Sequence, residues 1–289
     1  MMCRAQLQMT LGLFYGSCGT HDGPAKLAQN LVAGLTRIGV DIRANEIGEM
    51  NGCLQSWAPE YQRLPHHTLM GPNLVVVPAD DASLWQRHHS FVVPSLWVKR
   101  LYERYDLTQG RKLLVVSAGV DTDVFTGEKQ VTRDGFIYFK HRSEGELSIV
   151  EAAMRRRKIS YSVIRYGHYR ECDLIAVAQS SRFCILLTGT ESDGIAVKEI
   201  LATNTPCFAC NTSIWRYGSY PECPAASVPW FDATCGIVVE HFSDDAFDRF
   251  HGQIHLYEPR KYVLEHHTLE LAARRYLNAV HEAHGNPVS

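Results

Sequence analysis

Short β-rich runs alternate with helical patterns along the whole chain. Near the start, the apolar run at residues 10–15 predicts a strand, and apolar residues then recur every four positions from Leu27 to Leu35, as on one face of a helix. Pro24 stands where the first helical residue would be, and Gly39 stands just past the last one, as is usual at helix ends. This alternation predicts parallel sheets with helices on both faces.

The same rhythm occurs twice. In the first half we expect further strands at residues 40–44, 73–77, 91–93 and 113–117. In the second half we expect strands at residues 136–139, 161–165, 183–187, 206–210 and 236–239, and helices opened by Ser143 and Glu146, over 195–202 and along 269–280. A polar stretch at 126–134 separates the halves. The predicted class is α/β, with two Rossmann-like doubly wound domains facing a central cleft, an N-terminal one over residues 1–130 and a C-terminal one over residues 131–289.

Composition narrows the class of protein further. Of the 289 residues, 45% are hydrophobic and 21% are charged, which is ordinary for a globular protein. The net charge of -2 argues against a nucleic-acid partner bound through a broad basic surface. No apolar run approaches the roughly 18 residues of a transmembrane helix. Nine cysteines, an odd number without framework spacing, favour reduced thiols and a cytoplasmic location.

The segment from Glu191 to Glu199 carries the most chemical information. Both glutamates flank a predicted strand-to-helix junction, so both carboxylates are expected to face the crevice above the strand ends, where doubly wound sheets bind ligands. The backbone amides around Gly194 and Ile195 would point into the same crevice and favour an anion. Carboxylates accept hydrogen bonds from sugar hydroxyls, and helix amides bind phosphate, so the two together suit a nucleotide sugar. The alternative is an ordinary amphipathic helix whose acids in the first turns complement the helix dipole.

Several motifs in the same order resemble the GT-B retaining glycosyltransferases of the family-four type. Glu191 and Glu199 have the spacing of that family's Glu-x7-Glu motif. Residues 93–102, with Pro-Ser-Leu-Trp-Val-Lys, are similar to its segment before the domain junction, and residues 117–125, with Ala-Gly-Val-Asp, are similar to the junction itself. Pro-Arg-Lys-Tyr at 259–262 resembles the segment before the family's terminal helix. The resemblance implies a GT-B fold whose last helix crosses back toward the first domain.

The resemblance also implies residues that bind the donor in the C-terminal domain. Basic residues after its first strand hold the diphosphate in the family, and that place is occupied here by Lys140 and Arg142. Tyr166 and Gly167 are included in the expected substrate-binding set. For the two basic residues, the alternative is a solvated strand end.

In the N-terminal domain the resemblance implies an acceptor side. The turn from Gly16 to Gly23 follows the first strand, where the family has a glycine loop close to the ligand, although a simple turn with positive φ is an equal alternative. The family also has a histidine or aspartate near the sugar. Asp80 and Asp81 follow Val77, and Asp81 is the candidate for this catalytic role.

Two patterns resemble metal sites, but the surrounding sequence of each favours another explanation. Asp121-Thr-Asp123 resembles an Asp-x-Asp site but lies in a Gly-Val-Asp-Thr-Asp turn. Cys207 and Cys210 have zinc-like spacing but flank a predicted buried strand, where reduced cysteine is common. We therefore expect no metal and no cofactor.

The resulting prediction is a hexosyl- or pentosyl-type retaining glycosyltransferase. Its partners would be a nucleotide-sugar donor and a glycan or other hydroxyl acceptor. The alternatives are a nucleotide-sugar epimerase of similar fold and a catalytically inactive nucleotide-sugar-binding protein. The sequence leaves the base, the sugar, the acceptor and the oligomeric state open.

Overall fold

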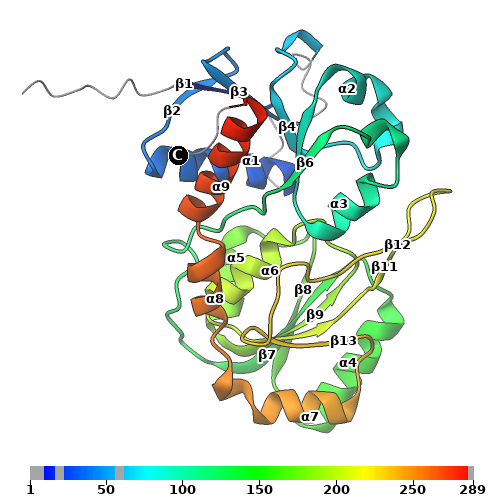
Figure 1. Cartoon of the computed structure of the whole chain (residues 1–289). Helices are drawn as coiled ribbons and strands as arrows, with labels where there is room; N and C mark the ends of the chain where they lie inside the picture. Colours follow the sequence, from blue (N-terminus) through cyan, green and yellow to red (C-terminus); the bar gives the residue numbers. More distant parts are fainter. Residues whose placement is uncertain (1–9, 17–22, 56–61, 286–289) are drawn as a thin grey trace, which may run out of the picture. The chain divides into compact units, whose positions relative to one another are not determined.

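The computed structural model describes residues 10–16, 23–55 and 62–285, and it divides into two compact units (Figure 1). The first unit contains the chain up to Gly119 and the segment from Leu269 onward, and the second unit contains Val120–Thr268. The chain passes from the first unit to the second after Gly119, whereas the expected boundary was at residue 130. The last helix, α9 (Leu269–Ala283), belongs to the first unit, whereas the expected domain 131–289 included it.

A six-stranded parallel sheet forms the centre of the first unit. Its strand order is β2-β1-β3-β4-β5-β6. Strand β2 is added on one side of β1 and the later strands on the other, so the topological switch point of this sheet lies between β1 and β3. The strands are β1 (Thr10–Phe14), β2 (Asp41–Ala44), β3 (Met50–Gln55), β4 (Leu69–Asn73), β5 (Ser90–Val93) and β6 (Lys112–Val115). The remaining elements are α1 (Gly23–Arg37), the 3-10 turn η2 (Pro78–Asp81), α2 (Ala82–Arg87), α3 (Leu96–Tyr102) and the 3-10 turn η3 (Asp106–Thr108).

Helices cover both faces of this sheet because successive strand residues point to opposite sides. Val92 packs with the core residues of α1 and α9, while its neighbour Phe91 stacks on Trp85 of α2 with ring centroids 4.0 Å apart. Helices α1 and α9 approach closely at Gly34, where a Cβ atom would collide with the carbonyl group of Leu269. Residues far apart in the chain thus share one core, and α9 is an integral part of the first unit.

The strand expected at residues 73–77 is wrong. The strand in this region is β4, which ends at Asn73 and contains Pro72, and the apolar residues after it form a connection. Val77 is fully buried there, and the hydroxyl of Tyr102 donates a hydrogen bond to the carbonyl group of Val75. Val77 is thus buried without entering the sheet, whereas Val76 is 43% exposed, so the hydrophobicity of this run alone gave a false strand signal.

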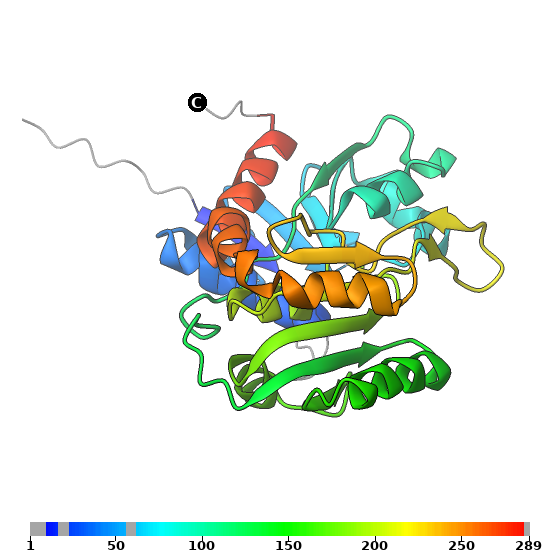
Figure 2. The same cartoon turned by 90° about the horizontal axis from the view of Figure 1, so that it is seen from below.

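The second unit is built on a five-stranded parallel sheet with the order β13-β10-β9-β7-β8. Figure 2 shows these strands running side by side in one direction. The strands are β7 (Arg133–Lys140), β8 (Tyr161–Arg165), β9 (Ser181–Thr188), β10 (Cys207–Cys210) and β13 (Gly236–Val239), with a separate hairpin of β11 (Ile214–Trp215) and β12 (Cys223–Pro224). The helices are α4 (Glu144–Arg156), α5 (Glu171–Gln179), α6 (Ile195–Ala202), α7 (Asp244–Gly252), the 3-10 turn η4 (Ile254–Leu256) and α8 (Pro259–His266).

The order of the five strands fixes where this unit can bind a ligand. The chain starts at β7, adds β8 on one side and then β9, β10 and β13 on the other, so the topological switch point lies between β7 and β9. Core residues alternate along β7: Tyr138 packs with α5 and α6, whereas Ile137 and Phe139 pack with α4 and α7. The two-sided α/β architecture predicted from the sequence is confirmed.

Local signals in this unit also predicted several elements correctly. Ser143 caps α4 by accepting a hydrogen bond from the amide of Glu146, whose carboxylate accepts one from the Ser143 amide in return. The strand at 161–165, the helix at 195–202 and the strand at 236–239 have the expected bounds. Among the described residues, the structure has no helix whose length and apolar character would let it span a bilayer.

Candidate functional site

The carboxyl edge of β7 and β9 brings together residues far apart in the sequence. Lys140 is the last residue of β7, and Glu191 lies in the loop after β9. The Lys140 Nζ atom lies 2.9 Å from the Glu191 carboxylate. The same ammonium group lies 4.2 Å from the centroid of the Tyr166 ring, which follows β8. An ion pair with an aromatic neighbour therefore occupies the switch point of the second unit.

Glu191 is held by burial and by its backbone. The residue is 8% exposed, and its amide donates a hydrogen bond of 2.9 Å to the carbonyl group of Ala226. Burial raises the pKa of the Glu191 carboxyl, and the positive charge of Lys140 opposes that shift. Lys140 is thus the main nearby group that favours the charged form of this carboxylate, and the charge of His141 adds to its effect.

Gly194 sets the start of α6. Its φ of +77° is in the left-handed region, where glycine carries no steric penalty, and the helix begins at the next residue, Ile195. The first amides of a helix lack partners within it, and they are the usual site of anion binding. The loop before α6 is braced by Asp193 and Lys198, whose charged atoms lie 2.7 Å apart and whose side chains are 6% and 1% exposed.

Glu199 lies on α6 and is 5% exposed. It acts on the same pair of tyrosines as Glu191, whose hydroxyl oxygens, those of Tyr138 and Tyr169, lie 3.1 Å apart. Burial raises the pKa of Tyr169 to about 12, the hydrogen bond with Tyr138 opposes that shift, and the charges of Glu199 and Glu191 add smaller contributions to it. Sequence reasoning missed this pair, because Tyr138 lies within one predicted strand and Tyr169 lies four residues after another, with no local pattern that links them.

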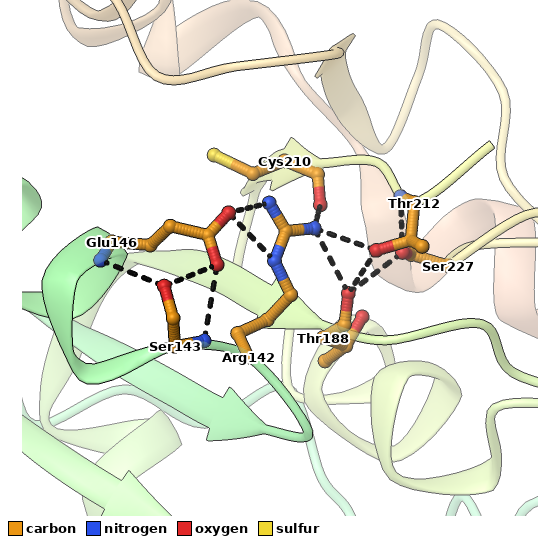
Figure 3. A network of polar contacts seen from close by, with 7 residues as sticks. All are labelled: Arg142, Ser143, Glu146, Thr188, Cys210, Thr212 and Ser227. Atoms are coloured by element: carbon orange, nitrogen blue, oxygen red, sulfur yellow. Dashed lines mark hydrogen bonds and ion pairs between the residues drawn. The ribbon is translucent and has the colours of Figure 1, made fainter. Parts of the chain in front are cut away.

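Arg142 has a different environment from Lys140, as Figure 3 shows. Its Nη1 atom donates to the carbonyl groups of Thr188 and Cys210 and, at 2.7 Å, to the hydroxyl of Thr212. Its Nε and Nη2 atoms donate to the carboxylate of Glu146. The side chain is 10% exposed, so the guanidinium group ties the ends of β9 and β10 to the start of α4. This geometry accounts for Arg142 by contacts that join strand ends, whereas Lys140 contacts Glu191 and Tyr166 at the edge of the sheet.

The remaining predicted residues of the second unit lie at its surface. The Tyr166 ring is 39% exposed and lies 5.5 Å from the ring of His141. Gly167 follows with φ +79°, in a turn where a side chain would meet open space. Tyr166 thus borders the Lys140 site directly, and Gly167 shapes the turn behind it.

The predicted residues of the first unit have local structural partners. Gly16 donates its amide to Gln55 at 2.8 Å, which joins the ends of β1 and β3 at the switch point of that sheet. Gly23 is the first residue of α1, and residues 17–22 of the expected glycine loop lie outside the described residues. Asp81 caps α2, because its carboxylate accepts hydrogen bonds from the amide of Leu84 and the hydroxyl of Ser83. The cap accounts for an acid at position 81 on structural grounds.

The metal-like patterns have structural explanations as well. Cys207 and Cys210 are buried in β10, and burial raises the pKa of Cys210 to about 12. The carboxylate of Asp121 accepts a hydrogen bond from the amide of Asp123 in a turn. Within the described part of the chain, no three His, Cys, Asp or Glu side chains converge in a way that could hold a metal ion.

Comparison with solved structures decides the fold. A glycosyltransferase from Rickettsia africae matches with a TM-score of 0.60 and 12% identity over 97% of this chain and 100% of that one. Sucrose-phosphate synthase from Thermosynechococcus elongatus matches with a TM-score of 0.62 and 10% identity over 96% and 99%. The chain has a GT-B-type fold.

A third match, to another GT-B structure, extends over a smaller part of that structure's chain. The pneumococcal O-GlcNAc transferase GtfA, solved with UDP and GlcNAc, matches with a TM-score of 0.51 and 11% identity over 82% of this chain and 57% of that one. A scan against protein-family models and a sequence search of curated proteins find no match. At these identities the structural likeness establishes the GT-B fold alone.

Proposed function

We propose that the protein is a glycosyltransferase that uses a nucleotide sugar as donor and a hydroxyl group, such as one of a glycan, as acceptor. The observation that carries the proposal is the convergence of Lys140, Glu191 and Glu199 with the start of α6 at the switch point of the second unit. Solved GT-B structures of similar fold include a transferase crystallised with UDP and GlcNAc, which supports the same ligand class here.

Each part of the site matches one part of a nucleotide sugar. The amides at the start of α6 and the ammonium group of Lys140 would hold the diphosphate, because both supply positive charge to phosphate oxygens. Glu199, buried on α6, would accept hydrogen bonds from the ribose hydroxyls. Glu191 would accept them from the sugar and stabilise the positive charge that develops at the anomeric carbon. The diphosphate would then share Lys140 with Glu191.

We further propose that the sugar is transferred with retention, as in the family-four type that the Glu-x7-Glu spacing resembles. The bond between the anomeric carbon and the diphosphate oxygen breaks, and the acceptor oxygen bonds to the same face of that carbon. The acceptor proton passes to the leaving diphosphate. The protein contributes positioning and charge stabilisation through Lys140, Glu191 and the α6 amides.

The first test is binding of nucleoside diphosphates. We expect wild-type protein to bind at least one member of a panel of UDP, GDP, ADP, CDP and dTDP in calorimetry. Glu199→Gln should weaken that binding by about 1–3 kcal/mol, the contribution of a hydrogen bond to a charged group. Lys140→Met should weaken binding of the diphosphate more than binding of the matching nucleoside. Equal effects on both ligands would reject Lys140 as a phosphate contact.

The second test separates a transferase from a nucleotide-binding protein. Glu191→Ala should lower kcat for donor hydrolysis or transfer substantially, while its affinity for the free nucleoside diphosphate changes little, because a group that acts on the transition state affects turnover more than ground-state binding. Turnover near the wild-type level would reject Glu191 as a catalytic residue. Proton NMR of the first product formed reports its anomeric configuration, and an inverted product would reject retention.

A further inference from the structure

The hairpin β11–β12 of the second unit carries a row of aromatic side chains that reaches its surface at Tyr217. The ring centroids of Trp215 and Tyr217 lie 5.8 Å apart with planes 25° from parallel, and those of Tyr217 and Tyr220 lie 6.0 Å apart with planes 4° from parallel. Trp215 is 8% exposed and anchors the row, whereas Tyr217 is 47% exposed. We call Trp215, Tyr217 and Tyr220 the aromatic row. The three rings are nearly parallel, and the row begins at the buried Trp215 and presents the half-exposed ring of Tyr217 to solvent.

Hydrogen bonds at the base of the hairpin hold it in place. The amide of Thr212 donates to the hydroxyl of Ser227 at 2.7 Å, and the amide of Ser227 donates to the Asn211 side chain at 2.8 Å. Nearer the tip, the amide of Ala225 donates to the carbonyl group of Ser213 at 2.8 Å. The two arms are therefore joined to each other before the aromatic row begins.

The same base is joined to the candidate donor site. The hydroxyl of Ser227 donates to the carbonyl group of Thr188, the last residue of β9, at 2.8 Å (Figure 3). The amide of Glu191 donates to the carbonyl group of Ala226. In Figure 2 the hairpin lies beyond the arrowheads of the parallel strands, on the side where β7 and β9 end. The aromatic row is thus attached to the loop that carries Glu191.

The tip of the hairpin has polar groups beside the rings. Arg216 and Glu222, which form an ion pair of 2.5 Å, are 66% and 58% exposed. Flat apolar rings bordered by planar hydrogen-bonding groups are the combination that a pyranose ring requires, since it presents C–H groups on its faces and hydroxyl groups around its edge. The charged pair offers hydrogen-bonding groups that a purely apolar partner would not use, and because its two charges cancel it gives no electrostatic preference for a phosphorylated partner.

We infer that the aromatic row binds a pyranose unit of a glycan acceptor by stacking and holds that glycan next to the donor site of the same unit. This inference rests on the proposed glycosyltransferase function. It adds a carbohydrate-binding surface on the second unit to the donor site proposed there.

The experiment measures carbohydrate binding without the donor, so that it can fail independently of the donor site. An immobilised panel of α- and β-linked oligosaccharides of glucose, galactose, mannose and N-acetylglucosamine is probed with the full chain. We expect wild-type protein to bind at least one class. Tyr217→Ala should weaken that binding about tenfold or more, the scale of one lost ring contact. Tyr217→Phe, which keeps the ring, should bind nearly as wild type.

Two controls test whether a loss of binding comes from the aromatic row itself. Leu256→Ala removes a side chain that is 62% exposed elsewhere on the same unit, and it should leave binding unchanged. Thermal melting of every variant confirms that the unit is folded. Failure of wild-type protein to bind any member of the panel overturns the inference, and so does equal binding by Tyr217→Ala. Flotation with phosphatidylglycerol vesicles that depends on Tyr217 would also overturn it, because aromatic residues then serve a membrane surface.

If the wild type binds glycan but no nucleoside diphosphate, the aromatic row is supported and the proposed transferase function fails. If it binds nucleoside diphosphate but no glycan, the donor site is supported and the aromatic row fails. If the wild type binds both ligands, Tyr217→Ala should raise KM for the glycan acceptor, while kcat for donor hydrolysis by water stays unchanged. A fall in that kcat equal to the loss in transfer would place Tyr217 in the donor site and contradict the inference.

Discussion

Replacing Lys198 by methionine would remove a buried ammonium group that lies 2.7 Å from the carboxylate of Asp193. Methionine has a similar length and shape, so the substitution removes the charge while keeping most of the packing. The two side chains are 1% and 6% exposed, which leaves little water to replace the lost partner. Removing one member of a buried ion pair costs about 3–5 kcal/mol, because the other charge stays buried.

The size of this effect sets the assay. For a domain of about 150–250 residues, each kcal/mol of destabilisation lowers Tm by about 2–4 °C, so Lys198→Met should lower the melting temperature of the second unit by roughly 6–20 °C. Differential scanning calorimetry measures this shift. Lys261→Met is the matched control in the same unit, since Lys261 and Glu258 form an ion pair whose side chains are 63% and 66% exposed. Exposed pairs contribute about 0–1 kcal/mol, so this control should change Tm little.

A double variant tests the reason for the loss. Lys198→Met combined with Asp193→Asn removes both charges, and replacing a buried pair by neutral groups of similar volume is often close to neutral. We expect the double variant to recover most of the Tm lost in Lys198→Met. A Tm for Lys198→Met equal to that of Lys261→Met would refute the assignment of a buried, stabilising partner. A double variant as unstable as the single one would attribute the loss to packing.

Three further predictions address the site and its supports. Arg142 lowers the pKa of Glu146 to about 2, so the stability that this carboxylate contributes is full above about pH 4.5 and is lost as the pH falls toward 2. Between these pH values, Tm should fall more for wild type than for Glu146→Gln. Equal slopes of Tm against pH would contradict the pairing. Gly194→Ala places a side chain at φ +77° and should cost about 1–2 kcal/mol in urea unfolding, whereas Gly23→Ala, at a helical position with open space, should cost nothing. Transfer should survive EDTA, because Lys140 and the α6 amides supply the positive charge for the diphosphate; loss under EDTA that manganese restores would refute this.

The sequence by itself determined the elements whose signals are local. A capping box needs only residues three apart, and the pair Ser143–Glu146 forms one as predicted. The helix Ile195–Ala202 also has its predicted bounds, because its apolar period and the preceding glycine lie within a few residues of each other. The alternation of such elements was enough to predict a two-sided α/β fold.

Strand β3 shows where local signals fail. Its sequence from Met50 to Gln55 mixes polar and apolar residues without alternation, yet all six residues are buried in the centre of the sheet. The polar members are satisfied there: Gln55 accepts from the amide of Gly16, and Asn51 exchanges hydrogen bonds with the backbone of Gly48. Burial of a polar strand depends on partners that only the folded chain supplies.

Only part of the candidate site could be predicted from local sequence features. The spacing of Glu191 and Glu199 and the glycine before α6 are local features, and they were predicted from the sequence. The partner of Glu191 was not, because Lys140 lies 51 residues away and meets it only through the switch between β7 and β9. The same topology assigned neighbouring Arg142 to a network that reaches Thr212, 70 residues away. Two basic residues with equal standing in the sequence have different contacts in the structure, since the order of the strands decides which chain ends lie beside each of them.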